Sequence, residues 1–356
     1  NDMYIAGITG EKLYKMFEEP EEFQYVYYKF EEAFEKFFIA LEEQFSSYEN
    51  ELIKIKIIAR HYPFKDKYKY HSDNKKLNQI YKLAKNTIKY GVQDSFLDCP
   101  SREKGQYFGD GVYSSLTHIL LTKDDSLYKK FIIDAFSSMK IDKCMTAQGP
   151  CSYYQTIAEF PLYIVISLKY YLLLTGNKKF VDSQFINVKK LINAYKKKYF
   201  NEKDQLISVY DRWNVVEWPQ SARDGYDFNL PQHGLTIGYH NVMNAFWIWA
   251  IKICDELYND TFGINLKNIE NSYLNHFFDD KRKMYIDSIN SHHVSLPSMI
   301  MGCLLNINKD EQAKNNLIEM IKLKGLTCSN LFMTPLMFLF LKNNHQEQLL
   351  NQLILD

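Results

Sequence analysis

The stretch Ser72-Asp-Asn-Lys-Lys-Leu-Asn-Gln-Ile-Tyr-Lys-Leu-Ala-Lys-Asn-Thr-Ile-Lys-Tyr-Gly91 has the pattern of an amphipathic helix. Its apolar residues recur at helical spacing and fall on one face: Leu77, Ile80, Tyr81, Leu83, Ala84, Ile88 and Tyr90. Polar residues at 72–74 provide a helix cap, and Gly91 provides a stop. The stretch therefore predicts one helix between this cap and Gly91.

The same pattern repeats toward the C-terminus. We expect further amphipathic helices at 110–122, 126–140, 156–175, 183–199, 236–258, 267–277, 292–305, 309–323 and 328–342. Their loops are alternately short and long, and strand signals are almost absent, which indicates an all-α domain of stacked αα-hairpins over residues 66–356. In such a barrel the active site is expected at the end where the long, aromatic-rich connections gather.

Residues 1–65 have a different pattern. Gln24–Phe30 and Leu52–Ala59 concentrate aromatic and β-branched residues over windows of strand length. Tyr62-Pro-Phe64 then marks a boundary, because proline disfavours helix in the residue before it. We therefore expect a small β-rich N-terminal segment ahead of the helical domain.

Composition excludes several classes of function. The 356 residues contain 43 Lys+Arg and 43 Asp+Glu, so no charge excess points to nucleic acid or an anionic membrane. No apolar run has the length of a membrane span, and the N-terminus lacks the pattern of a signal peptide. The six cysteines are scattered without a C-x-x-C pair, which favours reduced thiols in a cytoplasmic enzyme over disulfides or a zinc site.

Common catalytic motifs are also missing. H-E-x-x-H, G-x-S-x-G, P-loop and G-x-G-x-x-G patterns do not occur, so we expect neither a metal nor a cofactor. Aromatic residues make up 15% of the chain. Sugar rings stack on such side chains, which slightly favours a carbohydrate partner.

A second stretch, Asp98-Cys-Pro-Ser-Arg-Glu-Lys-Gly-Gln-Tyr-Phe-Gly-Asp110, holds three carboxylates and two cations on a segment broken by proline and glycine. One interpretation is a solvated, salt-bridged loop. The other is a loop clamped against the core by its aromatic neighbours, with carboxylate environments different enough to separate the pKa values for acid/base chemistry.

Three other segments contain candidate site residues. Met145–Glu159 ends in an acid among apolar neighbours, either solvated or facing a pocket. Tyr210–Asp227 combines Trp213, Trp218 and Arg223 with four acids, either as a binding loop or as a structural plug of the barrel end. His293 begins a predicted helix, where a histidine without a second ligand is more often structural.

The stretch Phe96–Asp110 resembles the signature of family 78 glycoside hydrolases, the α-L-rhamnosidases, in the form D-C-P-x-R-E-K-x-Q-Y-x-G-D. Glu217-Trp-Pro219 with Arg223-Asp-Gly-Tyr-Asp227 is similar to the family's D-W-P…R-D-G-Y-D loop, with Glu217 in place of the usual Asp. Ser291–Ser295 resembles its S-x-H-x-S segment. The resemblance runs from about residue 50 to the end and implies an (α/α)6 barrel of six helical hairpins.

For activity, the resemblance implies inverting hydrolysis of terminal α-L-rhamnosides, so a rhamnose-containing glycoside is the expected partner. Glu103 would be the general acid. Its pKa would have to be raised by burial against the opposing effect of Arg102 and Lys104. The remaining site residues implied by the resemblance would bind substrate: Asp98, Arg102, Asp110, Glu159, Trp213, Trp218, Arg223, Asp224, Tyr226 and His293. Among these, Arg102 would orient the carboxylates and the tryptophans would form an apolar wall for the sugar.

The family pattern also contains a G-A-T-T-x-x-E segment with the second carboxylate, beyond the hairpin that here ends at Asn351–Asp356. We therefore expect either a fragment of a longer product or a shortened homologue without this base. Two alternatives to hydrolysis of rhamnosides follow. One is an inactive sugar-binding module, and the other is a different barrel activity such as unsaturated uronyl hydrolysis, with Arg223 and Arg102 facing a carboxylate.

Overall fold

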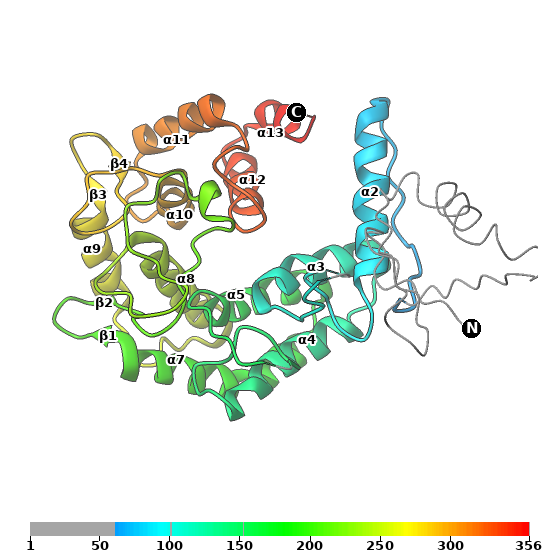
Figure 1. Cartoon of the computed structure of the whole chain (residues 1–356), viewed down its shortest axis with the longest axis horizontal. Helices are drawn as coiled ribbons and strands as arrows, with labels where there is room; N and C mark the ends of the chain where they lie inside the picture. Colours follow the sequence, from blue (N-terminus) through cyan, green and yellow to red (C-terminus); the bar gives the residue numbers. More distant parts are fainter. Residues whose placement is uncertain (1–60, 100–101, 152, 356) are drawn as a thin grey trace, which may run out of the picture.

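The computed structural model describes residues 61–99, 102–151 and 153–355, and this part of the chain is mainly helical (Figure 1). An inner row of helices consists of α3 (Phe108–Thr122), α5 (Phe160–Thr175), α8 (Asn241–Tyr258), α10 (Leu296–Leu305) and α12 (Thr334–Asn343). The outer helices are α2 (Lys75–Gly91), α4 (Ser126–Ser137), α6 (Lys178–Ser183), α7 (Phe185–Tyr199), α9 (Leu266–Phe277), α11 (Glu311–Lys324) and α13 (Glu347–Leu355). The predicted all-α, six-hairpin fold class is confirmed. Almost all of the predicted β-rich segment 1–65 lies outside the described residues.

Burial separates the inner from the outer helices. Most residues of α5, α8 and α10 are buried, as their almost uninterrupted apolar sequences require. An outer helix such as α7 buries one stripe only, formed by Val188, Leu191, Ile192, Tyr195 and Tyr199. Helix α2 begins at the predicted cap, where Asn74 accepts hydrogen bonds from two backbone N–H groups. None of its residues is fully buried, and Leu83 on its predicted apolar face is 68% exposed, because α2 packs mainly on α3.

An aromatic cluster joins the inner helices at their centre. The ring of Phe332, just before α12, lies 5.6 Å from Phe160 of α5, 5.5 Å from Tyr163 and 5.7 Å from Phe246 of α8, measured between centroids. Tyr113 of α3 donates a hydrogen bond of 2.8 Å to the carbonyl of Phe332. The segment before α12 is thereby fixed to three other inner helices.

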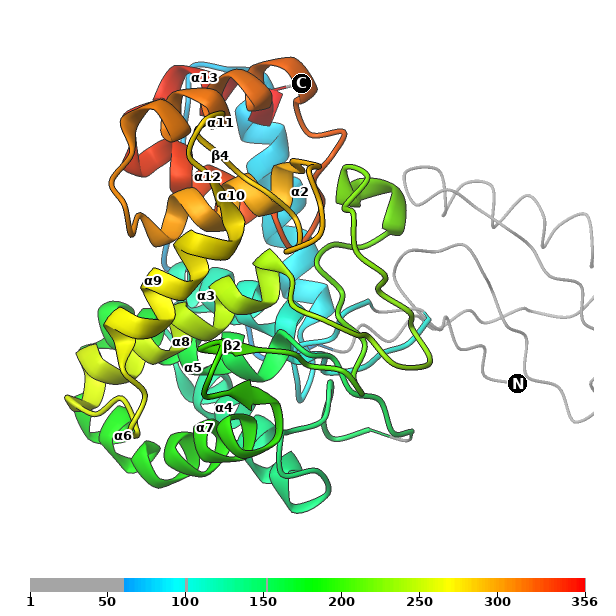
Figure 2. The ribbon, with the colours of Figure 1, turned by 90° about the vertical axis from the view of Figure 1, so that its left-hand side faces the viewer.

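The inner helices begin at the same end of the molecule, and the long connections gather there (Figure 2). Four predicted helices start four to six residues later than expected, at 160, 241, 296 and 334 instead of 156, 236, 292 and 328. The residues ahead of each start form loops whose apolar side chains happen to continue the helical spacing. This end of the helices therefore carries more loop than the sequence pattern indicated.

Several short elements were not predicted. Helices α6 and α13 are additional, and two hairpins of two-residue strands pair β1 (Phe200–Asn201) with β2 (Leu206–Ile207) and β3 (Phe278–Asp279) with β4 (Met284–Tyr285). Strands of this length are too short for an alternating pattern to reveal them. No helix in the described residues is long and apolar enough to cross a bilayer.

Candidate active site

Residues 210–227, here called the central loop, are held in place by buried carboxylates. Glu159, directly before α5, is fully buried and accepts hydrogen bonds from the backbone of Val215 (3.1 Å) and Val216 (2.8 Å). Burial raises the pKa of Glu159, and these N–H groups oppose the rise. Both carboxylate oxygens thus bind the loop and anchor it, while the contact of Glu159 with substrate stays a prediction.

Glu217 ties the central loop to α12. Its carboxylate is fully buried and accepts backbone hydrogen bonds from Trp218 and from three residues of the segment leading into α12, at 2.7 to 3.2 Å: Asn330, Phe332 and Met333. Four N–H groups satisfy one carboxylate at the positive end of a helix, where negative charge is stabilised. The longer side chain of Glu, where the family pattern has Asp, therefore has a structural role.

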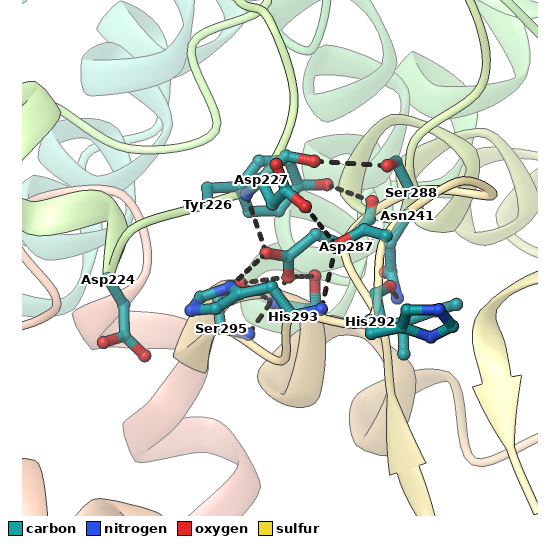
Figure 3. Close-up of polar contacts among 12 residues, drawn as sticks. Asp224, Tyr226, Asp227, Asn241, Asp287, Ser288, His292, His293 and Ser295 are labelled. Atoms are coloured by element: carbon teal, nitrogen blue, oxygen red, sulfur yellow. Dashed lines mark hydrogen bonds and ion pairs between the residues drawn. The ribbon is translucent and has the colours of Figure 1, made fainter.

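Asp287 joins the central loop to α10 (Figure 3). This fully buried residue accepts five hydrogen bonds. Its Oδ2 accepts from the backbone of Asp227 (2.8 Å) and from His293 Nδ1 (2.7 Å). Its Oδ1 accepts from the backbone and hydroxyl of Ser295 (3.0 and 2.6 Å) and from the hydroxyl of Ser298 (2.7 Å).

The contact with Asp287 orients His293. Because Nδ1 faces the carboxylate, Nε2 points the other way, and a Cβ atom at Gly225 would lie 3.6 Å from it. The position of Gly225 has φ +67°, which a glycine adopts without strain. The structure therefore brings the predicted His293 against the predicted R-D-G-Y-D turn.

Asp224 and Tyr226 of this turn are engaged within the protein. Asp224 accepts from the backbone of Leu296 (2.7 Å), the first residue of α10, and pairs with Lys324. The buried hydroxyl of Tyr226 contacts His240 Nδ1 (3.0 Å) and the carbonyl of Asp287 (3.1 Å). These contacts fix the turn, and the predicted contact of Asp224 and Tyr226 with substrate stays a prediction.

A buried ion pair anchors the start of the central loop. Arg212, 13 residues after Tyr199, donates to the hydroxyl of that tyrosine (2.8 Å) and to the carbonyl of Met145 (2.7 Å), and it pairs with Asp142. The neighbouring Trp213 lies edge-to-face with Trp218 at a centroid distance of 5.5 Å. Trp218 is 51% exposed, so it offers an apolar face beside the loop.

The acidic stretch lies ahead of α3. Asp98 Oδ1 accepts from the backbone of Gly105 (2.8 Å), and burial raises the pKa of Asp98. Asp110 is in the first turn of α3. Burial, aided by the nearby charges of Asp98, Glu103 and Glu217, raises the pKa of Asp110 to about 6. The glycine before it is required, since a Cβ at Gly109 would lie 2.3 Å from the Phe160 ring.

Glu103 differs from the expectation. It pairs with Arg102, and the Cys99 thiol donates to its Oε2 (2.9 Å). Burial raises the pKa of Glu103, but the hydrogen bonds from Arg102 and Cys99 outweigh it and bring the pKa down to about 2. The raised pKa that a general acid at Glu103 requires is therefore not found in this arrangement. The two interpretations of the stretch both hold in part. Burial raises the pKa of Asp110, as expected of a loop clamped against the core, whereas the salt bridge and hydrogen bonds of Glu103 lower its pKa.

Ligand atoms of Asp98, Cys99 and Glu103 lie within 4.8 Å of one another. The thiol proton and the Arg102 guanidinium already bind Glu103, which accounts for the cluster without an ion. Arg223, the other cation of the uronyl alternative, donates from Nε to the carbonyl of Glu217 (2.9 Å).

Residues 66–356 match the model of the bacterial α-L-rhamnosidase six-hairpin glycosidase domain. The chain belongs to this family. Among solved structures, it is similar to the family 78 rhamnosidase of Bacillus sp. GL1, with a TM-score of 0.66, 16% identity and coverage of 82% of this chain and 31% of that one. No curated protein sequence matches the chain.

Two further rhamnosidase structures share the fold. The Klebsiella oxytoca enzyme with rhamnose bound has a TM-score of 0.63 and 14% identity, over 79% of this chain and 54% of that one. The Streptomyces avermitilis enzyme complexed with L-rhamnose has a TM-score of 0.61 and 12% identity, over 82% of this chain and 27% of that one. The chain thus spans between about a quarter and a half of the length of these rhamnosidases.

Sequence reasoning missed two residues that organise the site of this family member. Asp287 is one acid between Ile286 and Ser288, and its only signal is the serine- and histidine-rich stretch that follows. The spacing of the six cysteines gives no signal for Cys99, although Cys99 lies inside the motif and binds Glu103. In both cases the partner is defined by the fold and not by spacing.

Proposed function

We propose that this domain carries out inverting hydrolysis of terminal α-L-rhamnosides, with Glu103 as the general acid. The observation that carries the proposal is that the central loop has both the acidic stretch and His293 beside it. Asp110 is close enough to Glu217 of this loop for the charge of Glu217 to raise its pKa, the His293 ring would lie 3.6 Å from a Cβ at Gly225, and the paired Trp213 and Trp218 are on the same loop. Membership of the rhamnosidase family supports the choice of substrate.

In this proposal Glu103 protonates the glycosidic oxygen as the bond to the leaving group breaks. Asp98 and Asp110 bind sugar hydroxyls and stabilise the positive charge that develops on the ring. Trp213 and Trp218 pack against the apolar face of the sugar. His293 donates or accepts through Nε2, since Nδ1 is held by Asp287.

Glu103 must gain a proton before it can act. Its side chain is ionised while Arg102 binds it, but the side chain of Arg102 is 78% exposed, and solvent screening makes such an exposed ion pair weak. Once Arg102 has moved away, burial acts on Glu103 with less opposition and raises its pKa. We therefore infer that substrate binding displaces Arg102.

The mechanism also needs a second carboxylate, about 6.5–9.5 Å from the acid, to activate water. We assign no residue to this role. Glu159 is bound to the central loop, and Asp224 is bound to Lys324 and α10. To act as the base, either carboxylate would therefore have to lose its hydrogen bonds or ion pair within the protein.

One observation favours a second candidate, an inactive sugar-binding homologue: the low pKa of Glu103, about 2, in this arrangement. Incubation with an aryl α-L-rhamnoside separates the two. Release of rhamnose that is lost in Glu103→Gln supports hydrolysis. Calorimetric binding of rhamnose without turnover supports the binding homologue and contradicts the enzyme.

A further inference from the structure

A cavity of about 510 Å³ lies along the central loop and the residues that follow it. Amide side chains of Gln220, Asn229 and Gln232 and the ring of Phe228 contribute to its wall. Among the described residues that form the wall, Arg223 is the one with a charged side chain. A polar cavity of this size with amides, an aromatic ring and a single cation has the chemistry of a site for a polar organic molecule.

Arg223 is the distinctive feature of this cavity. The residue is only 7% exposed, and its Nε donates to the carbonyl of Glu217. Within the described residues, its two terminal Nη groups have no hydrogen-bond or ion-pair partner. They are not among the buried polar atoms that lack a partner, so they are not fully enclosed by protein. These groups are therefore accessible from the cavity that Arg223 lines, and their N–H groups are free to donate hydrogen bonds to a ligand.

Nearby carboxylates do not supply the missing partner. Burial lowers the pKa of Arg223, and the charges of Glu159 and Glu217 offset this only in part. The oxygens of both carboxylates bind the backbone of the loops instead. A guanidinium held in this way offers a planar pair of donors, which matches a carboxylate group in two-point contact.

The cavity adjoins the position of His293. Gly225 lines the cavity, and a Cβ atom there would touch the imidazole at 3.6 Å. In the proposed function His293 contacts the terminal sugar, so a ligand in the cavity would be the next unit of the same chain.

We propose that this cavity binds a uronic acid, the sugar to which the terminal rhamnose is attached, with Arg223 binding its carboxylate and the amides binding its hydroxyls. This inference rests on the proposed function and narrows its substrate to rhamnosides of acidic sugars.

The test compares two disaccharides that differ in one group: α-L-rhamnosyl-glucuronic acid and α-L-rhamnosyl-glucose. A two-point, charge-assisted contact in a buried site gives the acidic disaccharide an advantage of about ten- to a hundredfold in kcat/KM. Arg223→Gln is expected to reduce this ratio to about one. Arg282→Gln, which removes an exposed arginine paired with Asp279, leaves the ratio unchanged.

A ratio near one in the wild-type chain, or a ratio that survives Arg223→Gln, overturns the proposal. Should Arg223→Gln fail to fold, calorimetry of the wild-type chain with free glucuronate and free glucose decides: binding of glucuronate alone supports the site, and no binding of glucuronate overturns it. Should neither disaccharide nor an aryl rhamnoside be cleaved, the proposed function fails, and the same calorimetry still decides the cavity.

Discussion

Replacement of Asp287 by alanine should destabilise the domain strongly, because its carboxylate accepts five hydrogen bonds in a fully buried position. The two serine hydroxyls can rotate to other acceptors, and His293 can move its proton to Nε2. The backbone N–H of the fully buried Ser295 cannot adapt in this way, whereas that of the exposed Asp227 can bind water. A buried donor without a partner costs about 1–3 kcal/mol, and the lost bonds from the buried serine hydroxyls to a charged group add to it, so we expect a loss of roughly 2–5 kcal/mol.

The assay is urea unfolding of the full chain followed by tryptophan fluorescence, together with thermal unfolding. A loss of about 4 kcal/mol corresponds to a melting temperature lower by roughly 8–16 °C, at about 2–4 °C per kcal/mol. The matched control is Asp280→Ala. Its side chain is 83% exposed and, among the described residues, pairs with Lys283 alone, so its removal should change stability by about 0.5 kcal/mol or less.

Asp287→Asn separates loss of charge from loss of volume. The amide oxygen keeps the contacts of Oδ1, but the amide nitrogen faces the N–H of Asp227, so we expect about half the loss of the alanine variant. Nitrogen-15 NMR of the imidazole should show the Nδ1–H form of His293 in the wild type and a shift toward the Nε2–H form in the variant. If the free energy of unfolding of Asp287→Ala lies within 1 kcal/mol of that of the Asp280→Ala control, the account of the Asp287 cluster is wrong.

Three other predictions concern carboxylates and their partners. Glu217→Ala leaves four backbone N–H groups without an acceptor and should lower the urea midpoint and speed amide exchange at 330–333; unchanged exchange there would contradict its role. The pKa of Asp110 is about 6 in the folded protein, against an ordinary value of 3.8, so the folded protein holds this proton more tightly than the unfolded chain does. The tighter binding stabilises the fold below about pH 4, and this stabilisation is lost as the pH rises through 6. Asp110→Asn should therefore be more stable than wild type at pH 7.5, by up to about 3 kcal/mol, and equal to it at pH 3.5, as measured by urea unfolding at both pH values; an equal gain at both would refute the shift. Cys99→Ala removes a thiol donor and should raise the pKa of Glu103 in a carbon-13 NMR titration, whereas an unchanged pKa would contradict a contribution from the thiol.

Long helices with regular spacing were predictable from sequence because one buried stripe imposes a periodic pattern. The cap at Asn74 and the stop at the end of α2 are examples. Helix starts were less predictable, since residues directly ahead of α5 and α12 are themselves buried and apolar, such as Ile157, Phe332 and Met333. Ile157 and Ala158 continue the spacing of α5 although they are outside it.

The identity of the site residues was more accessible from sequence than their roles. The motif located the acidic stretch, the central loop and His293, and the structure brings the loop and His293 together. Glu159 shows what sequence does not contain: an acid among apolar residues has the same local pattern whether it binds a sugar or two backbone N–H groups 56 and 57 residues away. The environment of Glu103 likewise depends on where Arg102 and Cys99 point, which spacing does not determine.

The most direct measurement of the central proposal is proton NMR of the hydrolysis of an α-L-rhamnoside with a poor leaving group, by the wild-type chain and by Glu103→Gln. The account predicts that β-L-rhamnose appears first, as inversion requires, and that the variant is slower by about 10²–10⁴-fold. A matched Glu202→Gln control, in which an exposed carboxylate is changed, should retain the wild-type rate. First appearance of the α-anomer, or a Glu103→Gln variant as fast as this control, would contradict the account.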